Sequence, residues 1–217
     1  MSAVDAAIAA LLPHLTELRH DLHQHPELSY EEERTAARIC RELGAVPGLQ
    51  VRSGVAGTGV VATLGADRPG PGVALRADMD ALSMEERTGA PWASKVPGRM
   101  HACGHDGHVT CLVGAAQVLA GMADRLEGPV KFLFQPAEEG GAGGRRMCEE
   151  GVLEDPPVAA IFGLHGWPAL PQGEVGIRPG AFLASADRFR IEVRGRGAHA
   201  AFPHQGVDPI LMAAHVV

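Results

Sequence analysis

The stretch MHACGHDGH, residues 100–108, places three histidines, a cysteine and an aspartate within nine positions. The chain has only 11 histidines and 4 cysteines in 217 residues, so composition alone predicts few such clusters. Cys103 and His105 lie in a turn around Gly104, where side chains two positions apart can converge as they cannot in a regular helix. Thiolate and imidazole bind transition metals, so the stretch predicts part of a metal site.

Two further segments can complete this site. Glu138 and Glu139 follow the apolar run 129–135, and His165 follows the apolar run 158–164. Two carboxylates held together in a cleft repel each other, so either one is protonated or both face a cation. Successive side chains leaving a strand point in different directions. Glu139 can therefore bind a metal while Glu138 faces the substrate as general base.

The candidate ligands offer one sulfur, two nitrogens and one oxygen, and they are Cys103, His105, Glu139 and His165. This set suits Zn and tolerates Mn or Co. In open α/β sheets ligands bind at the carboxyl ends of strands, where we expect these residues to meet. His108 is left open between support of a ligand and packing, and Asp106 between ligand support and helix capping.

Helical periodicity predicts three helices that would position these residues. Apolar residues three and four apart indicate a helix over 3–23, which Pro26 ends. Ser29 followed by Glu32 has the spacing of a capping box, which would open a second helix that Gly44 stops. A third helix over 105–123 follows the histidine cluster directly.

Short apolar runs predict the strands. Residues 59–65 and 72–78 are joined by a turn-forming sequence and are expected to form a hairpin. The runs 129–135 and 158–164 are expected to be buried on both faces, with the helical segment 143–153 between them. Strand, helix and strand in this order form a βαβ unit, so the fold class is α/β.

The pattern changes near the end of the chain. Residues 187–195 alternate apolar and polar side chains, as a half-exposed strand does, and a helix begins near Asp208. We therefore divide the chain into a metal-binding catalytic domain, 1–184, and the beginning of a smaller domain, 185–217.

Composition excludes several classes of function. The chain is 46% hydrophobic and 21% charged, with a net charge of −7 and no dense Lys/Arg stripe, so we expect no nucleic-acid partner. No apolar run reaches the ~18 residues of a membrane span, and the N-terminus lacks the basic region of a signal peptide. The cysteines show no disulfide or CxxC spacing, which favours reduced thiols and a cytoplasmic protein.

Five motifs together resemble a known family, in its order along the chain: LRADMDAL (75–82), MHACGHDGH (100–108), QPAEEGG (135–141), FGLHGWP (162–168) and GAHAAFPHQGVDPI (197–210). The sequence resembles the aminoacylase/carboxypeptidase family of two-metal peptidases. It is most similar to the branch of hippurate hydrolases and auxin-conjugate amidohydrolases. The resemblance implies a mixed sheet with flanking helices, as in zinc exopeptidases, and an inserted smaller α+β dimerisation domain.

The resemblance also implies the roles of single residues. Cys103 matches a ligand that bridges two divalent metal ions, Zn or Mn with Co or Ni as alternatives, and the other ligands present match His105, Glu139 and His165. Glu138 matches the general base, and Asp80 an aspartate beside the metals. His199 matches a histidine that the smaller domain supplies to the tetrahedral intermediate, often in the partner subunit of a homodimer.

The resemblance implies an amidohydrolase that cleaves the amide bond of N-acyl amino acids, such as hippurate-like, N-acetyl or indole-acetyl amino acids, with metal-activated water. The family's last ligand histidine, the rest of the smaller domain and the final strands are missing, so we expect a truncated chain. A catalytically incomplete metal-binding fragment is therefore an alternative. Another is a different class of enzyme, in which Cys103 is a nucleophile paired with His105 or His165.

Overall fold

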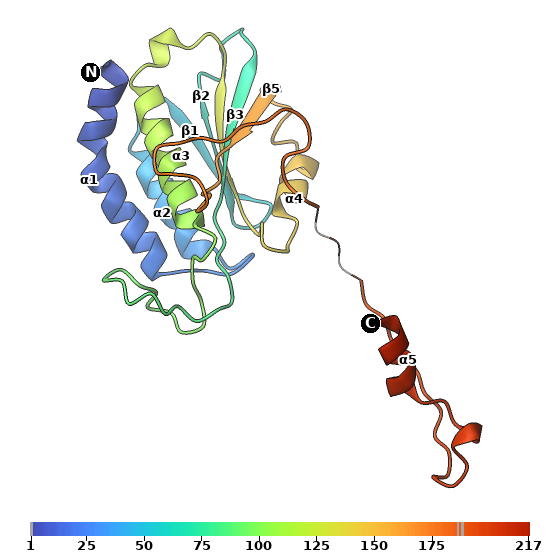
Figure 1. Ribbon diagram of the computed structural model, residues 1–217. Helices are drawn as coiled ribbons and strands as arrows, with labels where there is room; N and C mark the ends of the chain where they lie inside the picture. Colours follow the sequence, from blue (N-terminus) through green and yellow to red (C-terminus); the bar gives the residue numbers. More distant parts are fainter. Residues whose placement is uncertain (1, 186, 188) are drawn as a thin grey trace. The chain divides into compact units, whose positions relative to one another are not determined.

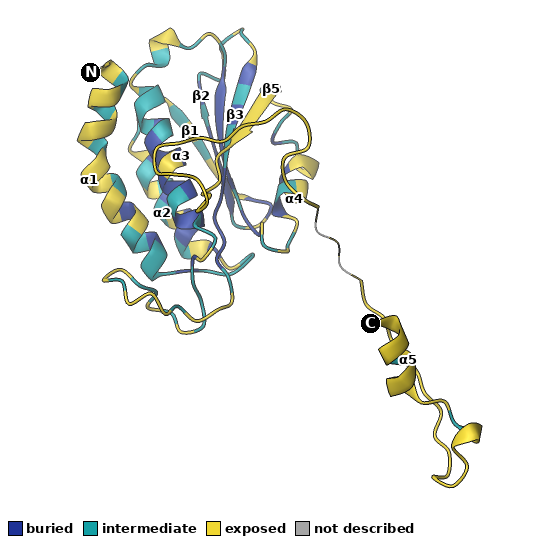
Figure 2. Ribbon diagram, viewed as in Figure 1, coloured by how far each residue is buried: buried dark blue, intermediate teal, exposed yellow. Residues whose placement is uncertain are grey.

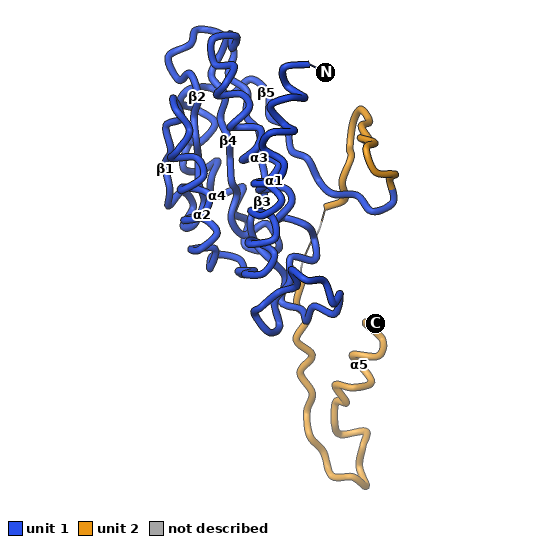
Figure 3. Tube along the Cα trace, turned by 90° about the vertical axis from the view of Figure 1, so that its left-hand side faces the viewer, with its two compact units in different colours: residues 1–169 blue, residues 170–217 orange. Residues whose placement is uncertain are grey.

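The computed structural model describes residues 2–185, 187 and 189–217. Two compact units divide the chain, Met1–Ala169 and Leu170–Val217 (Figure 3). The domain division at 184/185 stays a prediction.

The first unit contains one five-stranded sheet with the order β1-β2-β4-β3-β5. Its strands are β1 (Leu49–Val55), β2 (Gly59–Leu64), β3 (Gly72–Asp78), β4 (Val130–Gln135) and β5 (Val158–Gly163). Strand β2 pairs antiparallel with β1 and β4, and β3 pairs parallel with β4 and β5. The expected α/β fold with a mixed sheet is thus confirmed.

The hairpin predicted from 59–65 and 72–78 is wrong. Strand β4 lies between β2 and β3, so these two strands do not pair. The hairpin partner of β2 is β1, and the tight connection between them uses positive φ at Ala56 (51°) and Gly57 (100°). The turn-forming residues before β3 are compatible with a hairpin, but β3 gains two parallel neighbours in the sheet interior instead.

Only one of the two apolar runs is buried on both faces. The first five residues of β4 are buried, as predicted, whereas β5 is exposed along most of its length (Figure 2). Strand β5 is an edge strand that pairs only with β3 among the described residues. The expectation of burial is therefore wrong for β5, because an apolar run alone does not distinguish a central strand from an edge strand.

Three helices lie on one face of the sheet and α4 (Gly143–Glu149) lies on the other (Figure 1). The three are α1 (Ala3–Gln24), α2 (Glu33–Gly44) and α3 (His105–Ala120). Their apolar faces and the sheet form a core whose fully buried side chains include Leu18, Leu22, Ile39, Leu43, Val113, Phe132 and Phe134. This packing fixes the start of α3, and therefore the histidine cluster, against the sheet.

The N-terminus of α2 is capped differently from the prediction. The Glu27 carboxylate accepts hydrogen bonds from the backbone N–H groups of Arg34 (3.0 Å) and Thr35 (2.7 Å). The predicted capping box of Ser29 and Glu32 is absent from this described helix end. Ser29 bonds instead to Asp80, and Glu32 bonds to Thr58 and Ala137. The Glu27 carboxylate already accepts from the free N–H groups of the first turn.

The second unit contains a 3₁₀ turn, Pro203–Gln205, and helix α5 (Pro209–Val216). Asp208 caps α5 by accepting from the N–H of Ile210 at 2.9 Å, which confirms the helix start predicted there. The strand predicted at 187–195 includes Arg188, which lies outside the described residues, and its other residues form no strand. None of the helices in the described part of the chain is long and apolar enough to cross a membrane.

We predict that Gly143→Ala lowers the melting temperature more than Gly144→Ala does. A Cβ at Gly143 would lie 1.7 Å from the carbonyl oxygen of Pro136, so the backbone must shift, at a cost of about 1–3 kcal/mol. At Gly144 the nearest atom is the side-chain oxygen of Gln135, at 2.9 Å, which can move away. Thermal unfolding of both variants checks this, and equal melting temperatures would contradict it.

Candidate metal centre

The carboxyl ends of three parallel strands meet at one edge of the sheet. Asp78 ends β3 and lies in register with Gln135, which ends β4. The carboxylates Glu138 and Glu139 follow β4 within four residues, and His165 follows the end of β5. His105 is the first residue of α3, behind Gly104 in a left-handed conformation. The chain thus delivers the predicted residues to one place.

The other three predicted ligands lie close to His105. The ligand atoms of Cys103, His105 and His165 lie within 4.8 Å of one another, and so do those of His105, Glu138 and Glu139. The Sγ of Cys103 lies 3.4 Å from Nε2 of His165. His105 belongs to both groups, so the two groups form one continuous cluster.

The environment of His105 fits a bound cation. This side chain is fully buried, yet neither ring nitrogen has a hydrogen-bond partner. Its Nε2 lies 3.6 Å from Asp78 Oδ2, 3.7 Å from Glu139 Oε1 and 4.0 Å from Glu138 Oε2. Glu139 Oε1 is also buried without a partner. Buried polar atoms without partners are costly, and a metal ion among these donors would satisfy them.

The pKa values reveal the same crowding of negative charge. Burial raises the pKa of Glu138, and the neighbouring carboxylates of Glu139 and Asp78 raise it further. Burial and Glu139 raise the pKa of the Cys103 thiol to about 12. Burial opposes a charge on His105, but the carboxylates of Asp80, Asp78 and Glu139 outweigh it and raise its pKa. A cation would relieve this repulsion.

Asp80 connects the carboxylate pair to the histidine cluster. Its two oxygens accept hydrogen bonds from the backbone N–H groups of Glu138 and Glu139, each at 3.0 Å. Its Oδ1 also lies 3.5 Å from Nδ1 of His105, and Ser29 Oγ donates to its Oδ2 at 2.7 Å. Burial opposes the charge on Asp80, but these contacts lower its pKa. Asp80 therefore fixes the backbone of both glutamates and places a carboxylate oxygen near Nδ1 of His105.

His108 supports the cluster, a role that the sequence left open. Its Nδ1 donates to Asp78 Oδ1 at 2.7 Å, and its Nε2 accepts from the N–H of Gly166 at 2.8 Å. Nδ1 of the neighbouring His165 donates to the carbonyl of Gly166 at 2.7 Å, which leaves Nε2 facing Cys103. His108 thus connects the end of β3 to the loop that orients His165.

Asp106 ties the start of α3 to α1. Its Oδ2 accepts hydrogen bonds from Arg19 Nε (3.2 Å) and His23 Nδ1 (3.0 Å), and it makes no capping bond to the described helix end. The sequence did not predict that His23 bonds to Asp106 or that Asp78 bonds to His108. In the sequence, His23 is a histidine on an amphipathic helix and Asp78 an aspartate two residues before Asp80. Neither position indicates which residue the side chain will contact.

His199 belongs to the second compact unit, whereas the candidate ligands belong to the first. Within its own unit, Nδ1 of His199 accepts from the N–H of Ala201 at 3.1 Å, and its ring lies 5.7 Å from the ring of Phe202. Its expected role at the tetrahedral intermediate stays a prediction.

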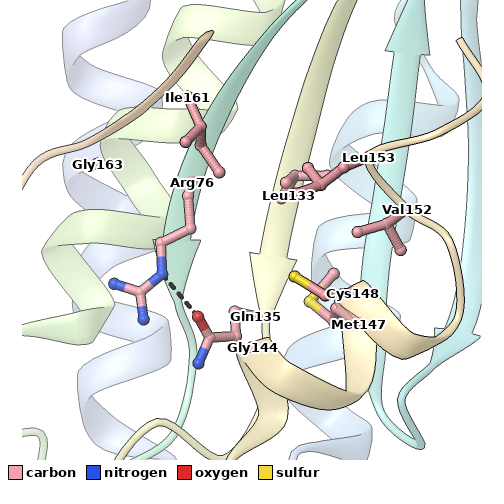
Figure 4. A pocket seen from close by; sticks show the side chains of 10 residues that line it. All are labelled: Arg76, Leu133, Gln135, Gly144, Met147, Cys148, Val152, Leu153, Ile161 and Gly163. Atoms are coloured by element: carbon pink, nitrogen blue, oxygen red, sulfur yellow. Dashed lines mark hydrogen bonds between the residues drawn. The ribbon is translucent and has the colours of Figure 1, made fainter. Parts of the chain in front are cut away.

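A cavity of about 370 Å³ lies between α4 and the strands β3, β4 and β5 (Figure 4). It is lined by Arg76, Leu133, Gln135, Gly144, Met147, Cys148, Val152, Leu153, Ile161 and Gly163. The guanidinium of Arg76 donates to Gln135 Oε1 at 2.8 Å and to Asp78 Oδ2 at 2.7 Å. The side chains of Arg76 and Gln135 thus connect the ends of β3 and β4 at the cavity wall.

Known proteins with similar sequences hydrolyse amides. An N-acetyl-L-cysteine deacetylase of Bacillus subtilis is 47% identical over 210 residues, which are 97% of this chain and 50% of that protein. The IAA-amino acid hydrolase ILR1-like 4 of Arabidopsis thaliana is 48% identical over 200 residues, 92% of this chain and 44% of its own length. The chain thus spans about half the length of the curated relatives it matches.

A solved structure of similar fold is described as a dinuclear metal binding peptidase. The crystal structure of Bacillus subtilis YXEP protein, a dinuclear metal binding peptidase, matches with a TM-score of 0.74 and 44% identity. The match covers 78% of this chain and 47% of that one. A protein-family model with the description "Peptidase family M20/M25/M40" matches residues 74–216, and this range includes every candidate ligand. The chain belongs to the M20/M25/M40 family of peptidases.

Proposed function

We propose that this chain carries the metal centre of an amidohydrolase that cleaves the amide bond of N-acyl amino acids. One observation carries the proposal: His105 is fully buried with no hydrogen-bond partner, among three carboxylates and the Cys103–His165 pair. Such a donor set has little stability without cations and supplies what a two-metal hydrolase needs.

Each residue has a distinct task in this proposal. Cys103, His105, Glu139 and His165 would hold two divalent ions, which when bound polarise the amide carbonyl and lower the pKa of the attacking water. Glu138 would take a proton from that water and return it to the leaving nitrogen. Its raised pKa suits this exchange because a base with an ordinary carboxylate pKa returns protons poorly. Asp80 would hold the backbone of both glutamates in place.

The relatives support the substrate class. The names N-acetyl-L-cysteine deacetylase and IAA-amino acid hydrolase describe an acyl group joined to an amino acid through an amide. We propose substrates of this type for the whole protein, with hippurate-like, N-acetyl and indole-acetyl amino acids as the candidates. His199 would then stabilise the tetrahedral intermediate from the smaller domain.

We also propose zinc or manganese as the metal, a homodimer as the assembly and the cytoplasm as the location. The mixed sulfur, nitrogen and oxygen donors suit zinc, and the carboxylate makes manganese acceptable. The four cysteines of the chain are free thiols in the structure, which accords with a reducing compartment.

A cysteine hydrolase is the rival function, because Cys103 Sγ lies 3.4 Å from His165 Nε2. A catalytic cysteine needs a low pKa to form its thiolate, whereas burial and Glu139 raise the pKa of Cys103 to about 12. Negative neighbours therefore disfavour a free thiolate here, and only a bound cation would generate one.

The proposal predicts metal-dependent hydrolysis. The longest reading frame that contains this sequence should release free amino acid from at least one of N-acetyl, N-benzoyl and indole-acetyl amino acids. A chelator should lower the rate by on the order of 100-fold or more, and added Zn or Mn should restore it. Activity that survives the chelator but not alkylation would favour the cysteine hydrolase. Bound metal without turnover of any substrate would favour a catalytically incomplete protein.

The two adjacent glutamates should differ in their response to alanine. Glu138→Ala should keep its metal but lose about 10²–10⁴-fold in kcat, because the proton acceptor is gone. Glu139→Ala should lose metal, because one ligand oxygen is removed. Metal content by elemental analysis and steady-state kinetics on the same samples check both. A Glu138→Ala enzyme that retained most of its turnover would show that Glu138 is not the base.

Metal binding should release a proton from Cys103. Because burial and Glu139 raise the pKa of this thiol to about 12, it is protonated in the metal-free protein at neutral pH and must ionise to bind metal. We expect the unsubstituted protein to release about one more proton than Cys103→Ser does. Calorimetric zinc titrations in buffers of different ionisation enthalpy measure this number. Equal proton release would mean that Cys103 is not a ligand.

A further inference from the structure

Glu32 is a fully buried carboxylate at the start of α2, far in the sequence from the metal centre. Its Oε1 accepts a hydrogen bond from the backbone N–H of Ala137 at 2.8 Å, and its Oε2 accepts from the hydroxyl of Thr58. Ala137 directly precedes Glu138. Burying a polar side chain is costly unless it is hydrogen-bonded, so the partners of Glu32 on the chain are informative.

The turn 136–142 needs such a contact. Ala137 and Ala142 have φ of 49° and 54°, in the left-handed region that L residues other than Asn and Asp rarely adopt. The carbonyl of Ala137 accepts from the N–H groups of Gly141 and Gly143, both at 3.2 Å, which closes the turn. An outside hydrogen bond to the N–H of Ala137 stabilises this unfavourable conformation.

A second residue of the same segment also reaches this turn. The hydroxyl of Tyr30 donates to the carbonyl of Gly141, and the guanidinium of Arg146 lies 4.7 Å from the centre of the Tyr30 ring. Glu32 thus contacts one end of the turn, at Ala137, and Tyr30 contacts the other end, at Gly141. Neither side chain contacts a candidate metal ligand through its own polar atoms in the described structure.

We propose that Glu32 is a positioning residue, which holds Ala137 in its left-handed conformation and thereby directs Glu138 and Glu139 into the metal centre. The inference rests on the proposed function for the tasks of these two glutamates. Glu32 acts through the backbone, so its loss disturbs the base and the ligand together. A residue needed only for folding would change stability and leave both tasks intact.

The test compares Glu32→Ala with Glu32→Gln in the longest reading frame that contains this sequence. Glu32→Ala should weaken zinc binding by about 10–100-fold and lower kcat by a similar factor, with little change in KM. Glu32→Gln should restore both, because its amide oxygen can accept from Ala137 and its NH₂ can donate to Thr58. Amide hydrogen exchange in 136–142 should speed up in Glu32→Ala and return to normal in Glu32→Gln.

Leu43→Ala is the matched control, because Leu43 is fully buried on the same helix and has no contact with the turn through polar atoms. It should lower the melting temperature but leave zinc affinity and exchange in 136–142 unchanged. If Glu32→Ala does not fold, Glu32→Met keeps a side chain of similar length, removes the oxygen that accepts from Ala137 and should also speed exchange in the turn.

Unchanged exchange and unchanged zinc affinity in a folded Glu32→Ala, or in Glu32→Met where that variant replaces it, would overturn the inference. Equal effects of Glu32→Ala and Leu43→Ala would overturn it as well. The proposed function fails separately, if the unsubstituted protein hydrolyses no N-acyl amino acid. Hydrogen exchange would then still decide the role of Glu32, because it reports the turn and not the reaction.

Discussion

The repulsion between carboxylates around His105 is the constraint on which the rest of this structure depends. Asp78, Glu138 and Glu139 each have an oxygen within 4.0 Å of one ring nitrogen of a fully buried histidine. Asp78 and His105 are buried and Glu139 is only partly exposed, so water screens these charges incompletely and the fold must hold them together against their own field. A protein keeps such an arrangement when a cation is to occupy it.

The sheet and Asp80 supply that restraint. Parallel pairing places the end of β3 in register with the end of β4, so that Asp78 lies opposite Gln135. Asp80, two residues further on, accepts the backbone N–H groups of Glu138 and Glu139. Helix α3 begins at the same edge, and its packing on α1 and β3 fixes His105. The crowded charges therefore depend on contacts between segments that are far apart in the sequence.

The sequence predicted the convergence of the candidate ligands better than it predicted the strand order of the sheet. The candidate ligands follow strands or open a helix, and the carboxyl ends of parallel strands meet wherever the sheet forms. Their convergence therefore needed no knowledge of strand order. The hairpin error has the opposite cause, because local turn residues before β3 indicated pairing with β2, whereas the parallel contacts with β4 and β5 decide its place. The same lack of non-local information hid the edge position of β5.

The supporting residues escaped prediction for a related reason. Glu32 has the spacing of a capping residue, but Glu27 takes the helix N–H groups, and Glu32 becomes available to Ala137. His108 has the spacing of a ligand support, yet only the folded chain shows that its partners are Asp78 and Gly166. Packing sets the distances that decide which donor bonds to which acceptor. The spacing of residues along one sequence does not give these distances.

Two identical neighbouring side chains can take different tasks because their surroundings differ. Asp80 holds the backbone of both glutamates equally, so the difference lies in where each carboxylate points. Glu139 is 22% exposed and has a buried oxygen without a partner, which suits a ligand, whereas Glu138 is 40% exposed and remains open to a substrate and water. Burial and the neighbouring carboxylate of Glu139 raise the pKa of Glu138, and a cation bound by Glu139 would reduce the effect of that neighbour without removing Glu138 from solvent. The proposed division between a ligand and a base therefore rests on burial and direction, with no difference in residue type.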